Sequence, residues 1–482
     1  MRKSKYLLLS SFLFFFFIHG FSQNRKDGKV TEIIILHTND MHAKIDNMGK
    51  LAYLADSLRR FHPYVFLLAA GDNFTGNPVV DMVEDKGYPM IDLMNQCGFN
   101  ASALGNHEFD LGQEFLNRRV EQAKFPFLCA NIQVTGGALK QPVPSTLLKA
   151  GNTTIDVVSF IELNENGFPD SHPSKLKGLS FSNGLVKAKE FSGLKSQYDV
   201  VVALTHLGVD DDKELAKQCQ GFDMIIGGHS HTIIDTTLLV NGVLITQAGC
   251  YLKFIGKTTI LLKDHKIISK KDELIPIGVL TRSKPEVQVL INKYNDNDEF
   301  KKVIATADQA IDGFDNLGSL YTDALRDHFK TDFAFQNRKG LRIYSIPQGD
   351  ITLKALYQLD PFQNQVVTYT LTADEMSSLI CNAFNKEKNI DLAVSGMNYT
   401  VTTDATGRCI AVEMQDPTGL PLNTTSTYTV AMNDYISSAY TFNHKSQAIS
   451  SGITTEQVLI EYLQKIKTVH YSGIERTFLK GK

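Results

Sequence analysis

Five short polar clusters in the first half of the sequence carry side chains that could bind metal ions. Each follows an apolar run with the composition of a buried strand or a strand-like turn. Their candidate functional groups are two carboxylates (Asp40 and Asp72), one asparagine amide (Asn106) and five histidines. The clusters are Asp40-Met41-His42, Gly71-Asp72-Asn73, Gly105-Asn106-His107-Glu108, Thr205-His206 and Gly227-Gly228-His229-Ser230-His231. Mixed oxygen and imidazole donors suit Zn, Mn or Fe. In a two-ion site one carboxylate can bridge both ions, about 3.5–4 Å apart. The pattern therefore predicts a dinuclear metal site.

Taken one at a time, these clusters are weak signals. A lone Asp-x-His is more often a surface dipeptide, and an isolated Gly-Asp is more often a turn. We interpret His37 as a structural residue at a strand end, and the histidines outside the clusters as surface or satisfied residues (His62, His172, His265, His328, His444 and His470). The prediction depends on the joint arrangement, because five such signals in order, each at a strand end, rarely arise by chance.

The segment from Thr31 to about Leu262 must supply the elements that bring the clusters together. Short β-branched runs alternate there with amphipathic stretches. We expect strands at 32–36, 65–69, 127–129, 155–160, 200–204 and 224–226, and helices at 51–58, 90–97, 113–123, 185–195 and 212–218. Such alternation is typical of a layered α/β domain, in which functional groups gather at the carboxyl ends of the strands. We therefore expect the clusters to converge in space.

A polar segment separates this region from a second domain. It contains Pro285, and an apolar helical face at Val287, Leu290, Ile291 and Tyr294 predicts a linker helix, not a flexible tether. The remaining chain opens with a helix around 317–328 and becomes strand-rich at 365–371 and 428–432. We predict a first domain over 28–265, a linker with a helix over 266–306, and a smaller second domain over 307–482.

The overall composition is that of a folded protein with small-molecule chemistry. The chain has 482 residues, of which 43% are hydrophobic and 21% charged, and these values exclude disordered, collagen-like and coiled-coil classes. Because the formal net charge is −3, we expect no nucleic-acid polymer as a partner. A small anionic substrate stays compatible, since a bound metal supplies local positive charge. The oligomeric state is left open.

The N-terminus has the pattern of a secretory signal peptide. Basic residues precede the apolar run Tyr6–Ile18, and Gly20-Phe21-Ser22 places small residues before a predicted cleavage at Gln23. The alternative is an uncleaved membrane anchor, but the run is shorter than the roughly 20 apolar residues that a span needs. We predict that residues 1–22 form a signal peptide and that the mature protein is periplasmic or extracellular, with no membrane attachment. Six scattered cysteines leave disulfide pairing open.

The order of the five clusters resembles the calcineurin-like metallophosphoesterase superfamily. The wider stretches 35–42, 103–112, 202–208 and 223–232 are similar to its secreted 5′-nucleotidase family. The resemblance continues past the linker, where 317–324, 349–352, 360–364 and 394–396 are similar to the C-terminal nucleotide-recognition domain of that family. It implies a four-layer α/β sandwich followed by a smaller α+β domain that recognises the substrate.

The resemblance also implies a ligand set for each of two divalent ions. The set for the first ion is Asp40, His42, Asp72 and His231. The set for the second is Asp72, Asn106, His206 and His229, so that Asp72 bridges the two. Many family members have Gln in place of His231. The metals are expected to be Zn, Mn or Fe.

His107 and Asp110 match the catalytic His-Asp pair of the family. Two ions lower the pKa of a bound water and neutralise phosphoryl charge. His107 would hydrogen-bond a phosphoryl oxygen or protonate the departing alkoxide, and Asp110, three residues on, would orient the imidazole and stabilise its charged form. We interpret Glu108 as a supporting or structural residue.

In the second domain the resemblance implies a substrate-binding loop, Asn337-Arg338-Lys339-Gly340-Leu341-Arg342. Arg342 stands at the position of the substrate-binding arginine, and its guanidinium fork suits phosphate. Asn337 opens the same loop and is expected to bind substrate. Arg338 and Lys339 replace small residues.

The aromatic residues expected to stack on a base differ from the family pattern. Phe442, or alternatively Tyr440, could supply one stacking face, with simple core packing as the competing interpretation. The partner aromatic is missing, because Asp391-Leu392-Ala393 precedes Val394-Ser395-Gly396.

These observations favour an exported, metal-dependent phosphomonoesterase acting on nucleoside 5′-monophosphates, releasing nucleoside and phosphate for nucleotide salvage. The first alternative is a hydrolase of cyclic nucleotides, nucleotide sugars or other small phosphoesters. A remote alternative is a catalytically silent module that only binds such ligands, although every expected ligand position is occupied.

Overall fold

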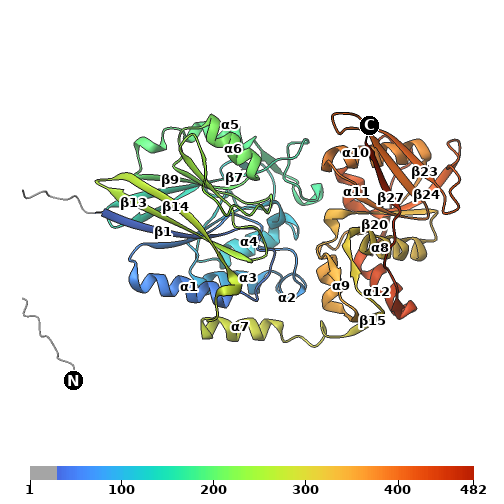
Figure 1. Cartoon of the computed structure of the whole chain (residues 1–482), viewed down its shortest axis with the longest axis horizontal. Coiled ribbons are helices and arrows are strands. Elements are labelled where there is room, and N and C mark those ends of the chain that lie inside the picture. The colour runs from blue at the N-terminus through green and yellow to red at the C-terminus, as the bar shows by residue number, and fades with distance from the viewer. Residues whose placement is uncertain (1–29, 482) are drawn as a thin grey trace, which may run out of the picture.

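A computed structural model describes residues 30–481 of the chain (Figure 1). The predicted signal peptide lies outside the described residues. Within the described part, no helix is long and apolar enough to cross a membrane.

Two six-stranded sheets form the first half of the chain. The strand order of the first sheet is β14 (Lys266–Pro276), β13 (Phe254–Lys263), β1 (Val30–Thr38), β2 (Val65–Ala69), β3 (Ala101–Ala103) and β4 (Phe127–Leu128). That of the second is β11 (Leu238–Val240), β12 (Val243–Thr246), β10 (Met224–Ile226), β9 (Val200–His206), β7 (Thr153–Ile161) and β6 (Ser145–Ala150). Buried β-branched residues of both sheets share one core, which includes Ile33, Ile35, Val157 and Val202. The two sheets therefore pack face to face.

Helices cover the outer faces of both sheets (Figure 1). The first sheet packs against α1 (Met48–Phe61), α3 (Tyr88–Cys97) and α4 (Gln113–Gln122). The short α2 (Pro78–Asp81) lies beside α3, and α7 (Pro285–Asn295) packs on α1 and α3. The second sheet packs against α5 (Gly184–Ala188) and α6 (Val209–Gln218). In α1 the buried Leu51, Ala52 and Ala55 form one face, as the helical spacing requires. The resulting helix–sheet–sheet–helix order is the predicted four-layer sandwich.

Most predicted elements of this half are present, and one is shorter than expected. The predicted helix over 185–195 ends at Ala188 and continues only as the 3₁₀ turns η3 (Lys189–Phe191) and η4 (Leu194–Ser196). Gly193 separates these two turns, and glycine is a poor residue for a helix interior.

Part of the predicted linker forms a strand of the first sheet. Residues 266–276, expected to be linker, form β14, because Asp264 and His265 both take positive φ in a tight turn and return the chain antiparallel to β13. The predicted linker helix is α7, which packs on α1 and α3. Strand pairing of the second half begins at β15 (Val303–Ala307), four residues before the predicted start at 307.

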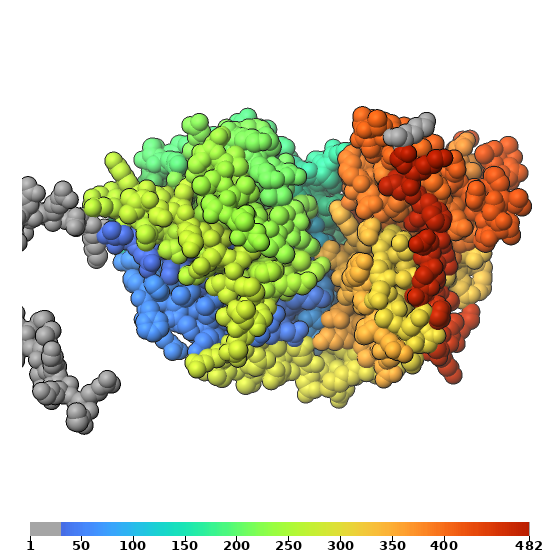
Figure 2. Space-filling model, viewed as in Figure 1, coloured from blue at the N-terminus to red at the C-terminus, as the bar shows by residue number. Residues whose placement is uncertain are grey.

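The second half is a smaller α+β unit. Its largest sheet has the order β21 (Leu392–Ser395), β17 (Phe333–Asn337), β24 (Thr427–Asn433), β20 (Gln365–Thr372) and β25 (Ile449–Thr454). Smaller sheets are β19 (Gly349–Thr352)–β15–β26 (Thr468–Val469), β23 (Cys409–Gln415)–β22 (Asn398–Thr403)–β27 (Thr477–Gly481) and β16 (Ile311–Asp312)–β18 (Ser345–Ile346). The helices are α8 (Gly313–Phe329), α9 (Leu353–Leu359), α10 (Ala373–Glu387), α11 (Asp434–Ala439) and α12 (Thr455–Ile466). The two halves abut, and the segment that contains α7 runs along one side of both (Figure 2).

One disulfide closes the second half, between Cys381 in α10 and Cys409 at the start of β23. The other four cysteines are free thiols: Cys97, Cys129, Cys219 and Cys250.

Candidate metal and phosphoester site

The five polar clusters meet at one edge of the paired sheets. Asp40 and His42 follow β1, Asp72 follows β2, and Asn106 follows β3, and these three strands are parallel neighbours. His206 is the last residue of β9, and the loop after the neighbouring parallel strand β10 carries His229 and His231. The carboxyl ends of these strands therefore place all seven predicted metal ligands together, as expected for an α/β sheet.

Asp40, His42 and His231 form the first group of potential ligands. His231 Nε2 lies 3.3 Å from Asp40 Oδ1 and 3.1 Å from His42 Nε2. Asp40 and His42 are fully buried.

Asp72 lies between the first group and the second. Its Oδ2 atom is 3.2 Å from His206 Nε2 on one side and 3.9 Å from His42 Nε2 on the other. Burial alone would raise the pKa of Asp72, but the imidazoles of His206 and His107 hold it well below its ordinary range. This carboxylate has the placement that a bridging ligand needs.

Asn106, His206 and His229 complete the second group. The Asn106 Oδ1 atom lies 3.2 Å from His206 Nε2 and 3.1 Å from His229 Nδ1. Asn106 directs its Nδ2 elsewhere, to the carbonyl oxygen of Asp170 at 3.1 Å, so its oxygen faces the two imidazoles.

The donor set fits divalent cations. The Nδ1 atoms of His42 and His206 donate to the backbone carbonyls of Thr75 (3.1 Å) and Ala70 (2.7 Å), so the Nε2 atom of each ring faces the other ligand groups. His42 Nε2 and His231 Nε2 approach within 3.1 Å, and His206 Nε2 lies 3.2 Å from Asp72 Oδ2. A divalent cation can replace the protons shared between these groups, and a set of imidazoles with carboxylates suits Zn, Mn or Fe.

The backbone at these positions is strained. Five of the seven potential ligands have positive φ, a conformation that L-residues seldom adopt: Asp40 (49°), His42 (45°), Asp72 (54°), His229 (75°) and His231 (54°). Such strain persists only where the surrounding structure imposes it, and it concentrates at functional sites.

Glu108 imposes part of this conformation. Its fully buried carboxylate accepts hydrogen bonds from the backbone N–H groups of Asp72 (2.9 Å), Asn73 (2.7 Å) and Gly105 (2.6 Å). It thereby ties the loop after β2 to the loop after β3. This contact set gives Glu108 the supporting role expected from the sequence.

His107 and Asp110 form a close pair next to Asp72. His107 Nδ1 lies 2.6 Å from Asp110 Oδ2, and His107 Nε2 lies 3.9 Å from Asp72 Oδ2. Burial lowers the pKa of His107, but the Asp110 and Asp72 carboxylates outweigh this and raise it above its ordinary value. The imidazole is therefore suited to carry a proton on the side that faces the ligand groups.

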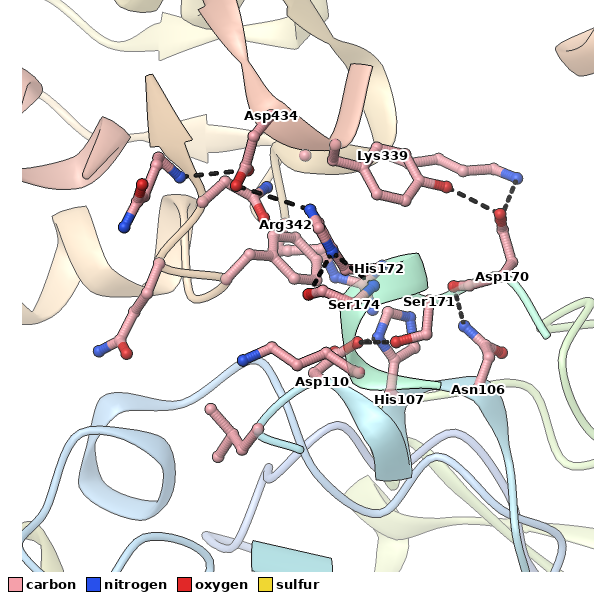
Figure 3. A pocket seen from close by; sticks show the side chains of 18 of the residues that line it. Asn106, His107, Asp110, Asp170, Ser171, His172, Ser174, Lys339, Arg342 and Asp434 are labelled. Carbon is pink, nitrogen blue, oxygen red and sulfur yellow. Dashed lines mark hydrogen bonds and ion pairs between the residues drawn. The ribbon is translucent and has the colours of Figure 1, made fainter. Parts of the chain in front are cut away.

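A pocket of about 560 Å³ opens beside this pair, between the two halves of the chain (Figure 3). The first half contributes Asn106, His107 and Asp110 to its lining, and the second half contributes Asn337 and Arg342.

Arg342 reaches across to the metal-ligand cluster. Its Nη2 lies 2.9 and 3.0 Å from the two ring nitrogens of His42, and its guanidinium lies 5.7 Å from the centre of the Phe362 ring. Its Nε is buried without a hydrogen-bond partner among the described residues. Arg342 is partly buried and lines the pocket, and a guanidinium in that place is suited to bind an anion.

Asn337 opens the loop over 337–342 and is buried, with 2% of its surface exposed. Its Oδ1 accepts a hydrogen bond from Asn433 Nδ2 at 2.9 Å. Asn337 therefore lines the pocket while its amide oxygen is occupied by the protein itself.

The structure places Phe442 elsewhere, which corrects the stacking prediction for this residue. Phe442 is buried in the core of the second half, with its ring centre 6.0 Å from that of Tyr369, and it does not line the pocket. Its apolar ring finds enough neighbours in that core to be buried there. Tyr440 is also buried and donates its hydroxyl to Asp391 Oδ2 at 2.5 Å.

Other residues supply the aromatic walls expected of Phe442. Phe115, Phe362 and Tyr435 line the pocket. The signals for two of them were in the sequence, since Phe362 lies in the motif over 360–364 and Tyr435 directly follows Asn433-Asp434. Asp170 and Ser171 also line the pocket, and no motif marks them.

Comparisons with known proteins agree with this architecture. The calcineurin-like phosphoesterase family matches residues 33–232, and the 5′-nucleotidase C-terminal domain family matches residues 301–442. The trifunctional nucleotide phosphoesterase protein YfkN of Bacillus subtilis is 28% identical over 92% of this chain and 34% of its own length. Human 5′-nucleotidase is 29% identical over 61% of this chain and 59% of its own length.

Solved structures show the same fold. The 5′-nucleotidase precursor from Thermus thermophilus aligns with a TM-score of 0.82 at 24% identity, covering 93% of this chain and 99% of that one. The chain spans between 34% and 59% of the length of the first three curated relatives it matches. The first half of the chain therefore carries a calcineurin-like phosphoesterase domain, and the second half carries a 5′-nucleotidase C-terminal domain.

Proposed function

We propose that this chain is an exported phosphomonoesterase that hydrolyses nucleoside 5′-monophosphates to nucleoside and phosphate. One observation carries the proposal. The His107–Asp110 pair and the metal-ligand cluster of the first half share a pocket with Arg342 of the second half. Such a pocket can hold a phosphate between cations while its second wall contacts the organic part of the substrate.

The proposed ligand sets are those that the family resemblance implies, and the proximity of the ligand groups supports them. We assign a first divalent ion to Asp40, His42, Asp72 and His231, and a second to Asp72, Asn106, His206 and His229. The catalytic domain would comprise about 28–265 with β14 added, and the substrate-binding domain the region after α7.

The residues of the chain then have defined tasks in phosphoryl transfer. When bound, the two ions would supply a metal-activated hydroxide and neutralise phosphoryl charge. Arg342 would hold a phosphoryl oxygen through its guanidinium, which lines the pocket. His107, protonated and oriented by Asp110 at 2.6 Å, would donate a hydrogen bond from Nε2 to the phosphoryl group or pass that proton to the departing alkoxide.

The nucleoside would occupy the wall made by the second half. Phe362 and Tyr435 offer aromatic faces there, and Asp434 offers hydrogen-bond acceptors for hydroxyl groups. Stacking of a base on one aromatic face contributes about 1–3 kcal/mol.

Export is supported by the signal-like N-terminus and by the Cys381–Cys409 disulfide, since disulfides persist in oxidising compartments. The periplasm or the cell exterior is the proposed location, and the substrate is the proposed small-molecule partner.

Phosphate release tests the proposal. The chain without residues 1–22 is incubated with AMP and Mn²⁺ or Zn²⁺, beside its His107→Ala variant and beside bis(p-nitrophenyl) phosphate. We expect AMP turnover that falls at least a hundredfold in the variant, within the range for loss of a general acid. AMP turnover that His107→Ala leaves intact would refute the assignment.

A second candidate is a hydrolase of cyclic nucleotides, nucleotide sugars or other small phosphoesters. Two observations favour it: Phe442 is in the core and not in the pocket, and the relative that matches 92% of this chain is named a trifunctional nucleotide phosphoesterase. Turnover of the synthetic diester without AMP turnover would select this candidate. Metal binding without turnover of either substrate would instead indicate a silent binding module.

A further inference from the structure

Asp170 projects from the first half of the chain into the second. It lies in the loop between β7 and the 3₁₀ turn η2 (Pro173–Lys175). Its carboxylate accepts a hydrogen bond from Tyr435 Oη at 2.7 Å and forms an ion pair with Lys386 Nζ at 3.3 Å. It forms a second ion pair with Lys339 Nζ at 3.8 Å (Figure 3). All three partners belong to the second half. The carboxylate is thus one point at which the second half holds this loop, beside the contact of His172 Nε2 with Asp434 Oδ2 at 3.5 Å.

The same loop holds the catalytic side through two other bonds. The Asp170 carbonyl oxygen accepts from Asn106 Nδ2 at 3.1 Å, and Ser171 Oγ donates to Asp110 Oδ1 at 3.2 Å (Figure 3). Both residues that receive these contacts have assigned roles, one as a metal ligand and one as the partner of His107.

Each bond fixes an orientation that the chemistry needs. Because the Asn106 amide directs Nδ2 to the Asp170 carbonyl, its Oδ1 faces His206 and His229. Because Ser171 occupies Oδ1 of Asp110, the other carboxylate oxygen is left for the imidazole. Contacts of this kind around a metal site change affinity or activity about 10–100-fold when removed.

We propose that Asp170 and Ser171 are positioning residues, which make the geometry of Asn106 and of the His107–Asp110 pair depend on docking of the second half of the chain. The inference rests on the proposed phosphoester hydrolysis at this site. It means that the second half does more than bind the organic part of the substrate. Through this dipeptide it also organises the reacting groups of the first half.

The test uses the mature chain with Mn²⁺ and two substrates, AMP and p-nitrophenyl phosphate, whose small leaving group needs no nucleoside-binding wall. The variants are Asp170→Asn, which keeps the backbone carbonyl but loses the charge, and Ser171→Ala. The control is Asn295→Ala, which removes contacts to Asp46 (2.9 Å) and Lys354 (3.2 Å) that also join the halves, outside the pocket.

We expect both variants to lower kcat about tenfold on both substrates, with KM within twofold and the control unchanged. Ser171→Thr, which keeps a hydroxyl, should restore most of the kcat lost in Ser171→Ala. If only the KM for AMP rose and kcat on p-nitrophenyl phosphate were retained, the proposal would be overturned. Asp170 and Ser171 would then only hold the two halves together. Circular dichroism verifies that each variant is folded.

A binding measurement separates this inference from the proposed function. Titration calorimetry with Mn²⁺ should show about tenfold weaker binding in Asp170→Asn than in wild type or Asn295→Ala. Wild type that turns over neither substrate would count against the proposed function, and equal Mn²⁺ affinity in Asp170→Asn and wild type would count against the coupling.

Discussion

Gly105→Ala should disable the site without disturbing the fold. Gly105 has ordinary backbone angles (φ −105°, ψ −178°), so alanine brings no conformational penalty. Its Cβ, however, would overlap Asp72 Oδ1 and lie 2.7 Å from Asp72 N and 2.8 Å from His206 Nε2. Ordinary van der Waals contact begins at 3.4 Å, so the bridging carboxylate and an imidazole would have to retreat. We expect shifts of roughly 0.6–1 Å at groups that hold both proposed ions.

Displacements of that size cost about 100-fold in activity, or about 2.7 kcal/mol at 1.36 kcal/mol per decade. The assay is kcat/KM for p-nitrophenyl phosphate with Mn²⁺, together with metal content by elemental analysis and a thermal melt followed by circular dichroism. Gly136→Ala is the matched control, because a Cβ there meets nothing within 4 Å. We expect the control to stay within twofold of wild type. Gly105→Ala with wild-type metal content and activity within threefold would refute the placement of Asp72 and His206.

Three further predictions concern the second half. Burial raises the pKa of Asp391 to about 6, so the protonated side chain favours the folded state at low pH, and this stabilisation is lost as pH rises from about 4 through 6. Between pH 4.5 and 7.5 the free energy of unfolding of Asp391→Asn, measured with urea, should therefore rise by roughly 1–3 kcal/mol relative to that of wild type. If the free energy of unfolding depended on pH equally in the variant and in wild type, this prediction would be contradicted. Arg342→Lys should lower kcat/KM for AMP at least tenfold, because an ammonium cannot reproduce the guanidinium fork; full activity would exclude a guanidinium-specific role. Replacing Cys381 and Cys409 by serine should lower the stability of the second half by about 2–4 kcal/mol, seen as a shifted thermal transition. An unshifted transition would show that the disulfide is not needed for this fold.

The sequence predicted the first half well because its signals are local. Strand β2 matches the predicted residues 65–69, and helices α3 and α4 follow their apolar spacing closely. Strand β14 was missed, since an edge strand with a solvent-facing side alternates charged and apolar residues much as a polar linker does. Only pairing with β13 distinguishes the two, and pairing is not a local property.

The metal-ligand cluster was predictable because each ligand directly follows a strand, and the strand order brings these ends together. The substrate wall was less predictable. Phe442 and Tyr435 are both aromatics in the same short stretch, and only tertiary packing decides that Tyr435 lines the pocket and Phe442 joins the core. Asp170 gave no signal, because its importance depends on Tyr435 and Lys386, more than 200 residues away. Ser171 gave none because its partner Asp110 is 61 residues away.

The positive φ values link the fold to the chemistry. Each strained residue costs on the order of 1–3 kcal/mol, so five strained ligands represent a cost comparable to the whole stability of a domain. The fold can sustain this cost because each loop starts at a buried strand and Glu108 ties three loop N–H groups to one carboxylate. Bound cations would add stabilisation that only the strained form receives. The loops are therefore expected to be least stable without metal, and added Mn²⁺ should raise the thermal transition of the first half by several degrees while Gly105→Ala loses that increase.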